Sequence, residues 1–354
     1  MKPLPSPLAR SDAGQLLCRL RTAATAASLA ILSCIGQVAH AGPYDSLFVF
    51  GDSLSDSGNV FAVTDALSPG NGIPVAPYFD GRFSNGRNYA DRLAQRLGLS
   101  AEAVFRGGTN FAIGGATASQ VGPLPTSLVD QRNLFLAASG GVASPNALFV
   151  TWIGSNDIQN VLDAAVANPA SIAGAGTILE QSVADLRGTI LALAGVGARS
   201  FLVPTVPFLG LTPKYTAPNP NSVDTVSLGN LLSFAFNTAV DNMLLDIAQQ
   251  NGSPTITRLD TNAVFLQAML DPAAFGLTNV TQPCISGDFL APGSVCADAS
   301  QYLFWDQTHP TAGVHQIIGD LAFAAVVPVP GSALLFPAGL LVLMAVRRRN
   351  RVVS

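Results

Sequence analysis

Charged residues are scarce in this sequence. Of its 354 residues, lysine, arginine, aspartate and glutamate together make up 11%, and the formal net charge is −4. A protein that binds nucleic acid needs a basic face to neutralise phosphate groups. The sequence offers no such face, so we expect no nucleic-acid partner.

Several catalytic signatures are missing as well. There is no Cys-x-x-Cys pair, no histidine-rich cluster and no His-Glu-x-x-His helix, which excludes the usual zinc sites. The phosphate-binding Gly-x-x-x-x-Gly-Lys-Ser/Thr loop and the Gly-x-Ser-x-Gly nucleophile elbow are also absent. The sequence therefore implies no metal ion and no cofactor.

Residues 1–41 have the pattern of a signal peptide. A basic region, Met1 to Arg21, precedes the uncharged stretch Thr22 to Val38, and Ala39-His40-Ala41 has the small-x-small form of a cleavage site. We expect signal peptidase to release a mature chain that begins at Gly42. Export from the cytoplasm follows from this interpretation.

The leader leaves alternatives open. Thr22 to Val38 could be a core helix or a retained membrane anchor, although it is shorter than the roughly 20 apolar residues of a membrane span. Ile31-Leu32-Ser33-Cys34 could be a lipoprotein box acylated at Cys34, although Leu32 fits that motif poorly. Cleavage after Ala41 fits the whole pattern better.

Residues 328–354 have the pattern of a membrane-stop or sorting tail. Val327-Pro328-Val329-Pro330 precedes an apolar stretch from Gly331 to Val346, and four arginines follow it at positions 347, 348, 349 and 351. The tail resembles the PEP-CTERM sorting signal, with Val329 in place of the usual glutamate. The resemblance implies processing by an exosortase, and a permanent inner-membrane anchor is the alternative.

Cysteine is rare, and only one pair lies outside the leader. Cys18 and Cys34 fall in residues 1–41, whereas Cys284 and Cys296 lie in the central part. An even pair in an exported protein favours a disulfide, which would close a short loop just before Trp305. Two buried free thiols are the alternative.

Residues 42–327 alternate between short apolar runs and segments with helical spacing. This alternation is typical of a parallel sheet covered by helices on both faces, and we predict one three-layer α/β/α domain with a five-stranded, flavodoxin-like sheet. The predicted strands are Ser46 to Phe50, Val104 with Asn110 to Ala112, Leu148 to Trp152, Ser200 to Pro204, and Thr255 to Leu259. The predicted helices are Asn88 to Leu97, Ile172 to Leu193, Ser227 to Gln250, and Ala312 to Val326.

Sequence blocks at the ends of these strands resemble the GDSL (SGNH) hydrolase family, in its lecithinase and outer-membrane esterase branch. A lone Gly-Asp-Ser-Leu is usually only a turn or a helix cap, but here further blocks follow in the family's order. The blocks are Gly51-Asp52-Ser53-Leu54, Gly81 to Gly86, Asn110 to Thr117, Trp152 to Asp157, and Trp305 to Thr311. They span nearly all of residues 42–327.

The resemblance assigns Ser53 as nucleophile, His309 as base and Asp306 as its partner. A serine hydroxyl needs a base to take its proton as it attacks. Asp306 precedes His309 by three residues, close enough for its carboxylate to accept the imidazole N–H. His315 has no carboxylate at that spacing, so we interpret it as a partly buried or surface histidine of a helix.

The resemblance also implies an oxyanion hole. Its donors would be the backbone N–H of Ser53, the backbone N–H of Gly115 and the side-chain amide of Asn156. Gly114 could replace Gly115, and in isolation Asn156 would be interpreted as a turn residue. We expect Trp152 and Asp157 to support these residues without contacting the substrate themselves.

The sequence thus predicts an exported serine hydrolase that cleaves carboxylic esters through an acyl-serine intermediate. The esters could be acyl lipids, lipase-type esters or O-acetyl groups on polysaccharide. We expect secretion or attachment to the cell surface of a Gram-negative bacterium, or anchoring in the inner membrane facing the periplasm. The alternative is a catalytically silent surface or exopolysaccharide-associated binding protein with the same fold.

Overall fold

The computed structural model describes residues 42–119 and 126–327. The expected signal peptide, residues 1–41, and the expected sorting tail, residues 328–354, lie outside the described residues. Within the two described ranges, no helix is both long and apolar enough to cross a membrane.

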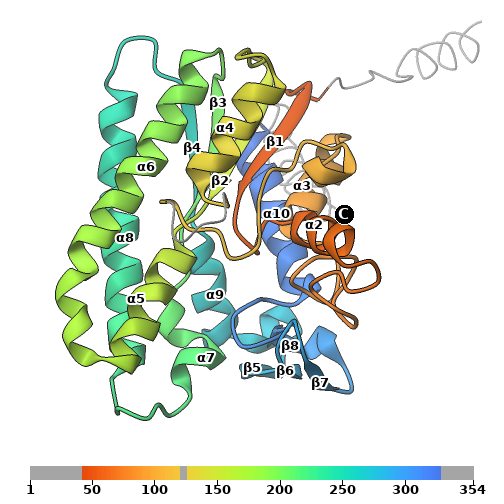
Figure 1. The fold of residues 1–354 in the computed structure, drawn as a ribbon, viewed down its shortest axis with the longest axis vertical. Coiled ribbons are helices and arrows are strands. Elements are labelled where there is room, and N and C mark those ends of the chain that lie inside the picture. The colour runs from red at the N-terminus through yellow and green to blue at the C-terminus, as the bar shows by residue number, and fades with distance from the viewer. Residues whose placement is uncertain (1–41, 120–125, 328–354) are drawn as a thin grey trace, which may run out of the picture. The chain divides into compact units, whose positions relative to one another are not determined.

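Four parallel strands form the central sheet (Figure 1). In their order across the sheet they are β1 (Ser46–Gly51), β2 (Ala147–Trp152), β3 (Ser200–Pro204) and β4 (Thr255–Leu259). All residues of β2 are buried, as expected of an apolar strand that is covered on both faces. These four strands coincide with four of the five predicted runs.

The predicted strand at Val104 with Asn110 to Ala112 is wrong as a regular strand. Val104 begins a 3-10 turn, and Asn110 makes isolated parallel bridges to Val49 on β1 and to Ala103. The Gln131 side chain explains why the pairing with β1 does not continue, because its oxygen accepts the Gly51 N–H at 2.9 Å, the donor that a longer parallel ladder would direct at the Phe111 carbonyl. Side-chain bonds of this kind compete with a strand ladder.

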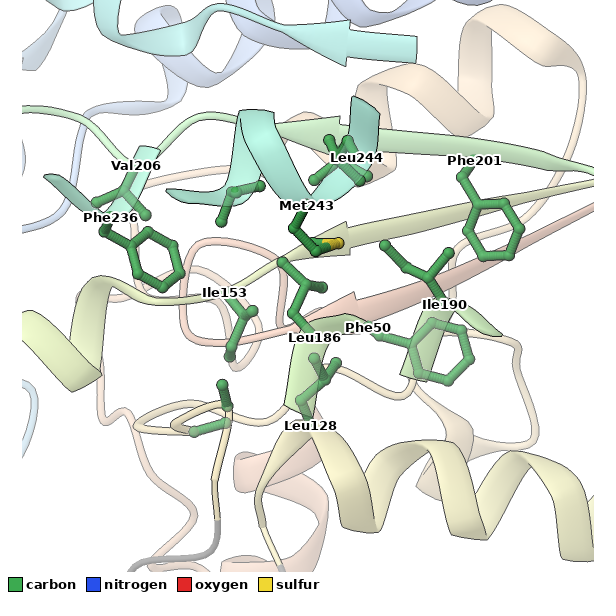
Figure 2. Close-up of a cluster of buried hydrophobic side chains, with 14 of the residues drawn as sticks. Phe50, Leu128, Ile153, Leu186, Ile190, Phe201, Val206, Phe236, Met243 and Leu244 are labelled. Carbon is green, nitrogen blue, oxygen red and sulfur yellow. The ribbon is translucent and has the colours of Figure 1, made fainter. Parts of the chain in front are cut away.

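Helices flank the sheet on both faces, which confirms the predicted α/β class. Because side chains alternate along a strand, Phe50 of β1 joins one core while Leu47 and Val49 join the other. The first core, shown in Figure 2, also takes in Leu186. It packs against α4 (Leu128–Ala138), α5 (Ser155–Ala167), α6 (Ala175–Gly195) and α8 (Thr225–Ala248), and the second against α3 (Tyr89–Leu97), α9 (Thr261–Leu270) and α10 (Ala312–Val326).

Local sequence accounts for where these helices begin. Asn88 caps α3 through a capping box with Asp91, in which the two side chains satisfy backbone N–H groups that have no partner within the helix. The predicted helices at Asn88 to Leu97 and Ala312 to Val326 match α3 and α10 closely. The two longer predicted helices match α6 and α8 within a few residues at each end.

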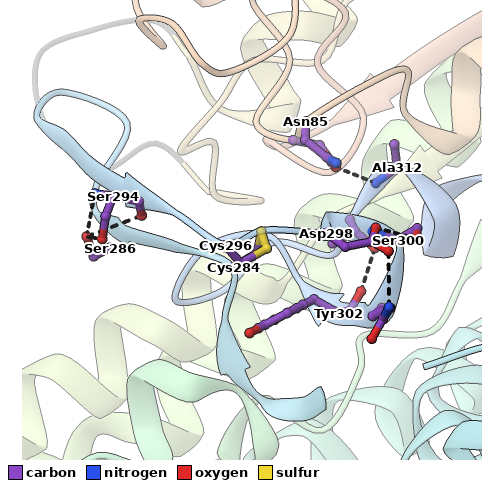
Figure 3. The surroundings of a disulfide bond; sticks show 12 residues. Asn85, Cys284, Ser286, Ser294, Cys296, Asp298, Ser300, Tyr302 and Ala312 are labelled. Carbon is purple, nitrogen blue, oxygen red and sulfur yellow. Dashed lines mark hydrogen bonds between the residues drawn. A yellow bond between two sulfur atoms is a disulfide. The ribbon is translucent and has the colours of Figure 1, made fainter. Parts of the chain in front are cut away.

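A small group of strands lies between α9 and α10 in the chain. It comprises β5 (Asn279–Pro283), β6 (Ile285–Gly287), β7 (Pro292–Val295) and β8 (Tyr302–Phe304), and β6 and β7 form an antiparallel hairpin. Figure 3 shows the disulfide that joins Cys284 to Cys296 at the base of this hairpin, with the two Cα atoms 4.9 Å apart. The predicted disulfide is therefore confirmed.

His315 lies in the interface between α3 and α10. Its side chain is buried, its ring lies 6.5 Å from the ring of Tyr89, and its Nδ1 atom accepts the Tyr89 backbone N–H at 3.3 Å. Burial, with a smaller contribution from the charge of His309, lowers the pKa of His315 to about 3. His315 is thus a buried packing residue, neutral at physiological pH.

This burial should make the free energy of unfolding depend on pH. Below about pH 6.5 the unfolded chain protonates this histidine, whereas the folded chain does so only near pH 3. The contribution of His315 to the free energy of unfolding is therefore complete above about pH 6.5. It is lost as the pH falls below this value, by up to about 1.4 kcal/mol per pH unit. When the free energy of unfolding is measured in urea at several pH values, its slope against pH should be shallower for His315→Gln than for the unaltered protein.

The matched control is Val314→Ala, which alters the buried neighbouring side chain without removing a titrating group. It should lower the free energy of unfolding by a similar amount at every pH. Equal slopes for His315→Gln and the unaltered protein would contradict the assignment of a neutral buried imidazole.

Candidate active site

Ser53 lies just beyond the carboxyl end of β1, where the chain turns under tight steric constraint. Gly51 has a φ of 157°, and a Cβ atom at this position would lie 2.3 Å from the carbonyl oxygen of Trp152. The Gln131 side chain brackets Gly51, accepting its N–H at 2.9 Å and donating to its carbonyl at 2.8 Å. These contacts fix the backbone two residues before Ser53, in a way that only glycine at position 51 permits.

The structure brings Ser53 and His309 together from positions 256 residues apart. The distance from His309 Nε2 to Ser53 Oγ is 2.7 Å, and His309 Nδ1 lies 2.8 Å and 2.9 Å from the two carboxylate oxygens of Asp306. The carboxylate favours a proton on Nδ1, which leaves the lone pair of Nε2 facing the serine hydroxyl. This arrangement can remove the hydroxyl proton as the oxygen attacks a carbonyl carbon.

The Asp306 carboxylate is buried and fully surrounded by donors. Besides the imidazole, it accepts the backbone N–H groups of Thr308 at 2.9 Å and His309 at 2.8 Å, and the Tyr78 hydroxyl at 2.8 Å. Burial opposes ionisation, but the charge of His309 and these hydrogen bonds outweigh it and keep the pKa of Asp306 below its usual value. Asp306 is therefore a stable anion at neutral pH.

Tyr78 is a site residue that the sequence did not reveal. It follows the segment Ser68 to Pro77, which is rich in proline, glycine and asparagine and is predicted only as a surface loop. The Tyr78 side chain is buried against the Trp305 ring, with the ring centroids 5.8 Å apart. No motif marks it, because its partner Asp306 is 228 residues away.

His309 is the basic group of this arrangement. Burial alone would lower its pKa, but the neighbouring Asp306 carboxylate, assisted by the more distant Asp52, raises the pKa above its ordinary value. The Asp306 carboxylate therefore stabilises the imidazolium that forms when His309 takes a proton from Ser53.

Asp52 lies next to Ser53 with its carboxyl buried. One oxygen accepts the Leu54 N–H at 3.0 Å, and the other has no hydrogen-bond partner in the described part of the chain. Burial raises the pKa of Asp52 to about 7, although the Leu54 hydrogen bond and the charge of His309 act in the opposite direction. The Asp52 carboxyl is therefore only partly ionised near neutral pH.

The expected oxyanion donors line the same cleft as Ser53. The Gly114 N–H is already bound to Asp56, with its nitrogen 2.9 Å from a carboxylate oxygen, so Gly115 is the better candidate of the two neighbours. The Asn156 amide nitrogen donates to the Ala116 carbonyl at 2.9 Å. Because an amide carries two N–H donors, this bond orients the side chain and leaves the other donor for a ligand.

Trp152 and Asp157 are buried next to these residues. The Trp152 indole N–H donates to the Thr205 carbonyl at 3.0 Å. The Asp157 carboxylate accepts the Ala118 N–H at 3.0 Å and the Ser182 hydroxyl. Neither side chain is among the described residues that line the cleft beside Ser53, and their supporting role stays a prediction.

The segment Gly81 to Gly86 attaches the His309 loop to the rest of the fold. The Ser84 hydroxyl donates to the Pro310 carbonyl at 2.8 Å, and the Asn85 oxygen accepts the Ala312 N–H at 2.8 Å, as Figure 3 shows. The Phe83 ring lies 5.5 Å from the His309 ring. The conformation of this segment therefore determines where the base sits.

The cleft that exposes Ser53 has a volume of about 460 Å³, within the usual range for small-molecule sites. Across residues 42–119 and 126–327, no group of His, Cys, Asp and Glu side chains is arranged to hold a metal ion. The residues that line the cleft are Ser53, Val60, Phe83, Gly114, Gly115, Asn156, Gln159, Lys214, Gly287, Asp288, Phe289, Asp306, Gln307, Thr308 and His309.

Loss of the Tyr78 hydroxyl should weaken the activation of Ser53. A fluorophosphonate, which reacts with activated serine hydroxyls, should label Ser53, and Tyr78→Phe should slow this labelling about 10-fold. The reason is that a hydrogen bond to a buried carboxylate contributes roughly 1.5–3 kcal/mol. Labelling rates followed by mass spectrometry provide the measurement.

The matched control is Tyr44→Phe, which removes a tyrosine hydroxyl that donates to the Val326 carbonyl at 3.1 Å instead. This variant should be labelled at the unaltered rate. If Tyr78→Phe were labelled as fast as Tyr44→Phe, the Tyr78 contact would have no part in positioning Asp306.

The sequence is similar to those of known proteins. Residues 47–322 match the family described as GDSL-like lipase/acylhydrolase. "Lipase 1" of Photorhabdus luminescens is 30% identical over 348 residues, which cover 81% of this chain and 50% of that protein. The chain thus spans about half the length of Lipase 1, and 53% of a second curated relative from Pseudomonas putida.

Two further proteins are matched over most of their own length. "GDSL esterase/lipase At5g55050" of Arabidopsis thaliana is 30% identical over 320 residues, which cover 78% of this chain and 84% of that protein. A solved structure of an extracellular lipase from Streptomyces rimosus aligns with a TM-score of 0.43 and 16% identity, covering 80% of this chain and 99% of that one. On the family match and the Arabidopsis relative, this chain belongs to the GDSL-like lipase/acylhydrolase family.

Proposed function

We propose that this protein hydrolyses carboxylic esters through an acyl-serine intermediate. The observation that carries the proposal is the unbroken chain of contacts from Ser53 Oγ through the His309 ring to the Asp306 carboxylate, with distances of 2.7 Å and 2.8 Å. The open cleft beside Ser53 gives a substrate access to it. No cofactor takes part in this scheme.

In the acylation step, Ser53 Oγ attacks the ester carbonyl carbon while its proton passes to His309 Nε2. The carbonyl oxygen becomes an anion, which would be held by the backbone N–H groups of Ser53 and Gly115 and by the Asn156 amide. Such donors contribute about 10²–10³ each in rate, because they are already oriented toward the developing charge. Asp306 stabilises the imidazolium that forms.

The intermediate then collapses and the cycle closes. The bond from carbon to the alcohol oxygen breaks, and His309 gives its proton to the leaving alcohol. A water molecule next attacks the acyl-serine, again giving a proton to His309, and the acid departs as the proton returns to Ser53 Oγ. The net reaction adds one water to one ester and yields an acid and an alcohol.

We further propose that the reaction takes place outside the cytoplasm. The basic and apolar pattern of residues 1–41 supports removal of a leader, and residues 328–354 support sorting by an exosortase or retention as an inner-membrane anchor. The disulfide between Cys284 and Cys296 suits an oxidising compartment. The enzyme would then meet substrates in the periplasm, at the cell surface or in the surrounding medium.

Esterase activity can be tested directly. The purified protein should hydrolyse p-nitrophenyl esters, and Ser53→Ala should reduce kcat to background because no other hydroxyl contacts His309 Nε2 within the described ranges. Ser55→Ala is the control, since the Ser55 hydroxyl bonds to Tyr89 at 2.8 Å and not to His309. A correctly folded protein that cleaves no ester in a panel including acetylated polysaccharide would instead favour a silent binding protein.

The fate of the tail has its own test. An epitope tag placed after Ser354 should be absent from the mature secreted protein if the tail is a cleaved sorting signal. Immunoblotting of medium and membrane fractions, with a second tag just after residue 42, gives the measurement. Recovery of both tags together in the inner membrane would favour a permanent anchor.

A further inference from the structure

Two chemically different groups of residues line the cleft beside Ser53. One group is apolar and consists of Val60, Phe83 and Phe289. The other is polar and includes Gln159 and Lys214, whose side chains approach to 3.5 Å. An ester has two parts, so the two groups can receive different ends of one substrate.

The apolar group reaches the reacting atoms through Phe83. The centroid of the Phe83 ring lies 5.5 Å from that of the His309 ring and 5.3 Å from that of the Phe289 ring, and the two phenylalanine rings meet edge to face. A Cβ atom at Gly114 would lie 2.3 Å from Phe83 and 3.2 Å from Val60, so both side chains also border the segment that carries Gly115. Phe289 is therefore linked to the base His309 through the Phe83 ring.

The hairpin that carries Phe289 is held at its base. The backbone N–H groups of Cys284 and Ile285 donate to the carbonyls of Phe304 and Trp305 at 3.1 Å and 2.8 Å. Trp305 directly precedes Asp306, so the hairpin is bonded to the segment that supplies the Asp306 carboxylate. The disulfide from Cys284 to Cys296, which directly follows β7, closes this base, as Figure 3 shows.

The tip of the hairpin is held as well. Asp288 accepts the backbone N–H groups of Leu290 and Ala291, each at 2.9 Å, which fixes the turn around Phe289. The Phe289 carbonyl accepts the Val75 N–H at 3.1 Å, which ties the tip to the loop that leads to Tyr78. These contacts hold the backbone on both sides of Phe289, which lowers the entropic cost of binding against its side chain.

We propose that Phe289, with Phe83 and Val60, binds the acyl chain of the substrate and makes medium-length acyl esters, rather than acetyl esters, the preferred class. The inference rests on the proposed function. An aromatic surface offers methylene groups a place out of water, whereas an acetyl group is too short to use it. The polar group with Gln159 and Lys214 suits the alcohol part, which leaves into water.

The proposal predicts a change in chain-length preference. For the unaltered protein, kcat/KM should be higher for p-nitrophenyl octanoate than for p-nitrophenyl acetate. Phe289→Ala should lower this octanoate-to-acetate ratio at least about 10-fold, since a single methylene in an apolar pocket is already worth about 10-fold or more. Phe289→Leu, which keeps an apolar side chain, should give an intermediate ratio.

The matched control is Leu290→Ala, which truncates the next side chain, exposed at 56% and outside the cleft. It should leave the ratio unchanged. Fluorophosphonate labelling of each variant verifies that Ser53 remains activated, and if Phe289→Ala is not labelled, Phe289→Leu alone decides the result.

Two outcomes would overturn the proposal. One is an octanoate-to-acetate ratio that is the same in the Phe289 variants and the unaltered protein. The other is that Phe289→Ala changes the preference among octanoate esters of different alcohols but keeps the octanoate-to-acetate ratio of the unaltered protein. This result would place the alcohol part of the substrate, and not the acyl chain, against Phe289. Failure of the unaltered protein to cleave any ester would instead refute the proposed function.

Discussion

Withdrawing the Asp306 carboxylate from water costs several kcal/mol unless hydrogen-bond donors replace the lost hydration. Here the donors are two backbone N–H groups of its own turn, the ring of His309 and the hydroxyl of Tyr78. The turn and the ring come from the same short segment, but Tyr78 comes from a loop more than 200 residues earlier. Satisfying one buried charge therefore forces two distant segments into a single arrangement.

The neighbouring contacts extend this arrangement outward. Ser84 bonds to Pro310 and Asn85 bonds to Ala312, so the segment beside Tyr78 also holds the start of α10. On the other side of Asp306, the disulfide-closed hairpin bonds to Trp305. Hydrogen bonds to the main chain tolerate little displacement, and the imidazole is thereby held within reach of the serine with little freedom to move away.

Features that depend on neighbouring residues in the chain could be predicted from the sequence. The three-residue spacing of Asp306 and His309, the helical spacing from Asn88 to Leu97 and the apolar run of β1 each indicate their structure locally. The predicted strand at Asn110 to Ala112 fails because the Gln131 side chain, 80 residues from Gly51 in the chain, takes the Gly51 N–H that would extend the ladder. Which acceptor this N–H finds is decided by tertiary packing, which hydrophobic periodicity does not record.

Other features depend on which distant residues meet. Gly115 is preferred to Gly114 as an oxyanion donor only because the Gly114 N–H is bound to Asp56. Tyr78 has no sequence pattern that singles it out. Because Ser53 follows β1 and His309 precedes α10, the first strand and the last helix of the described residues, a ribosome must complete almost all of residues 42–327 before the two can meet. A partly made chain therefore has no base beside Ser53, and its serine stays unactivated with no separate inhibitor required.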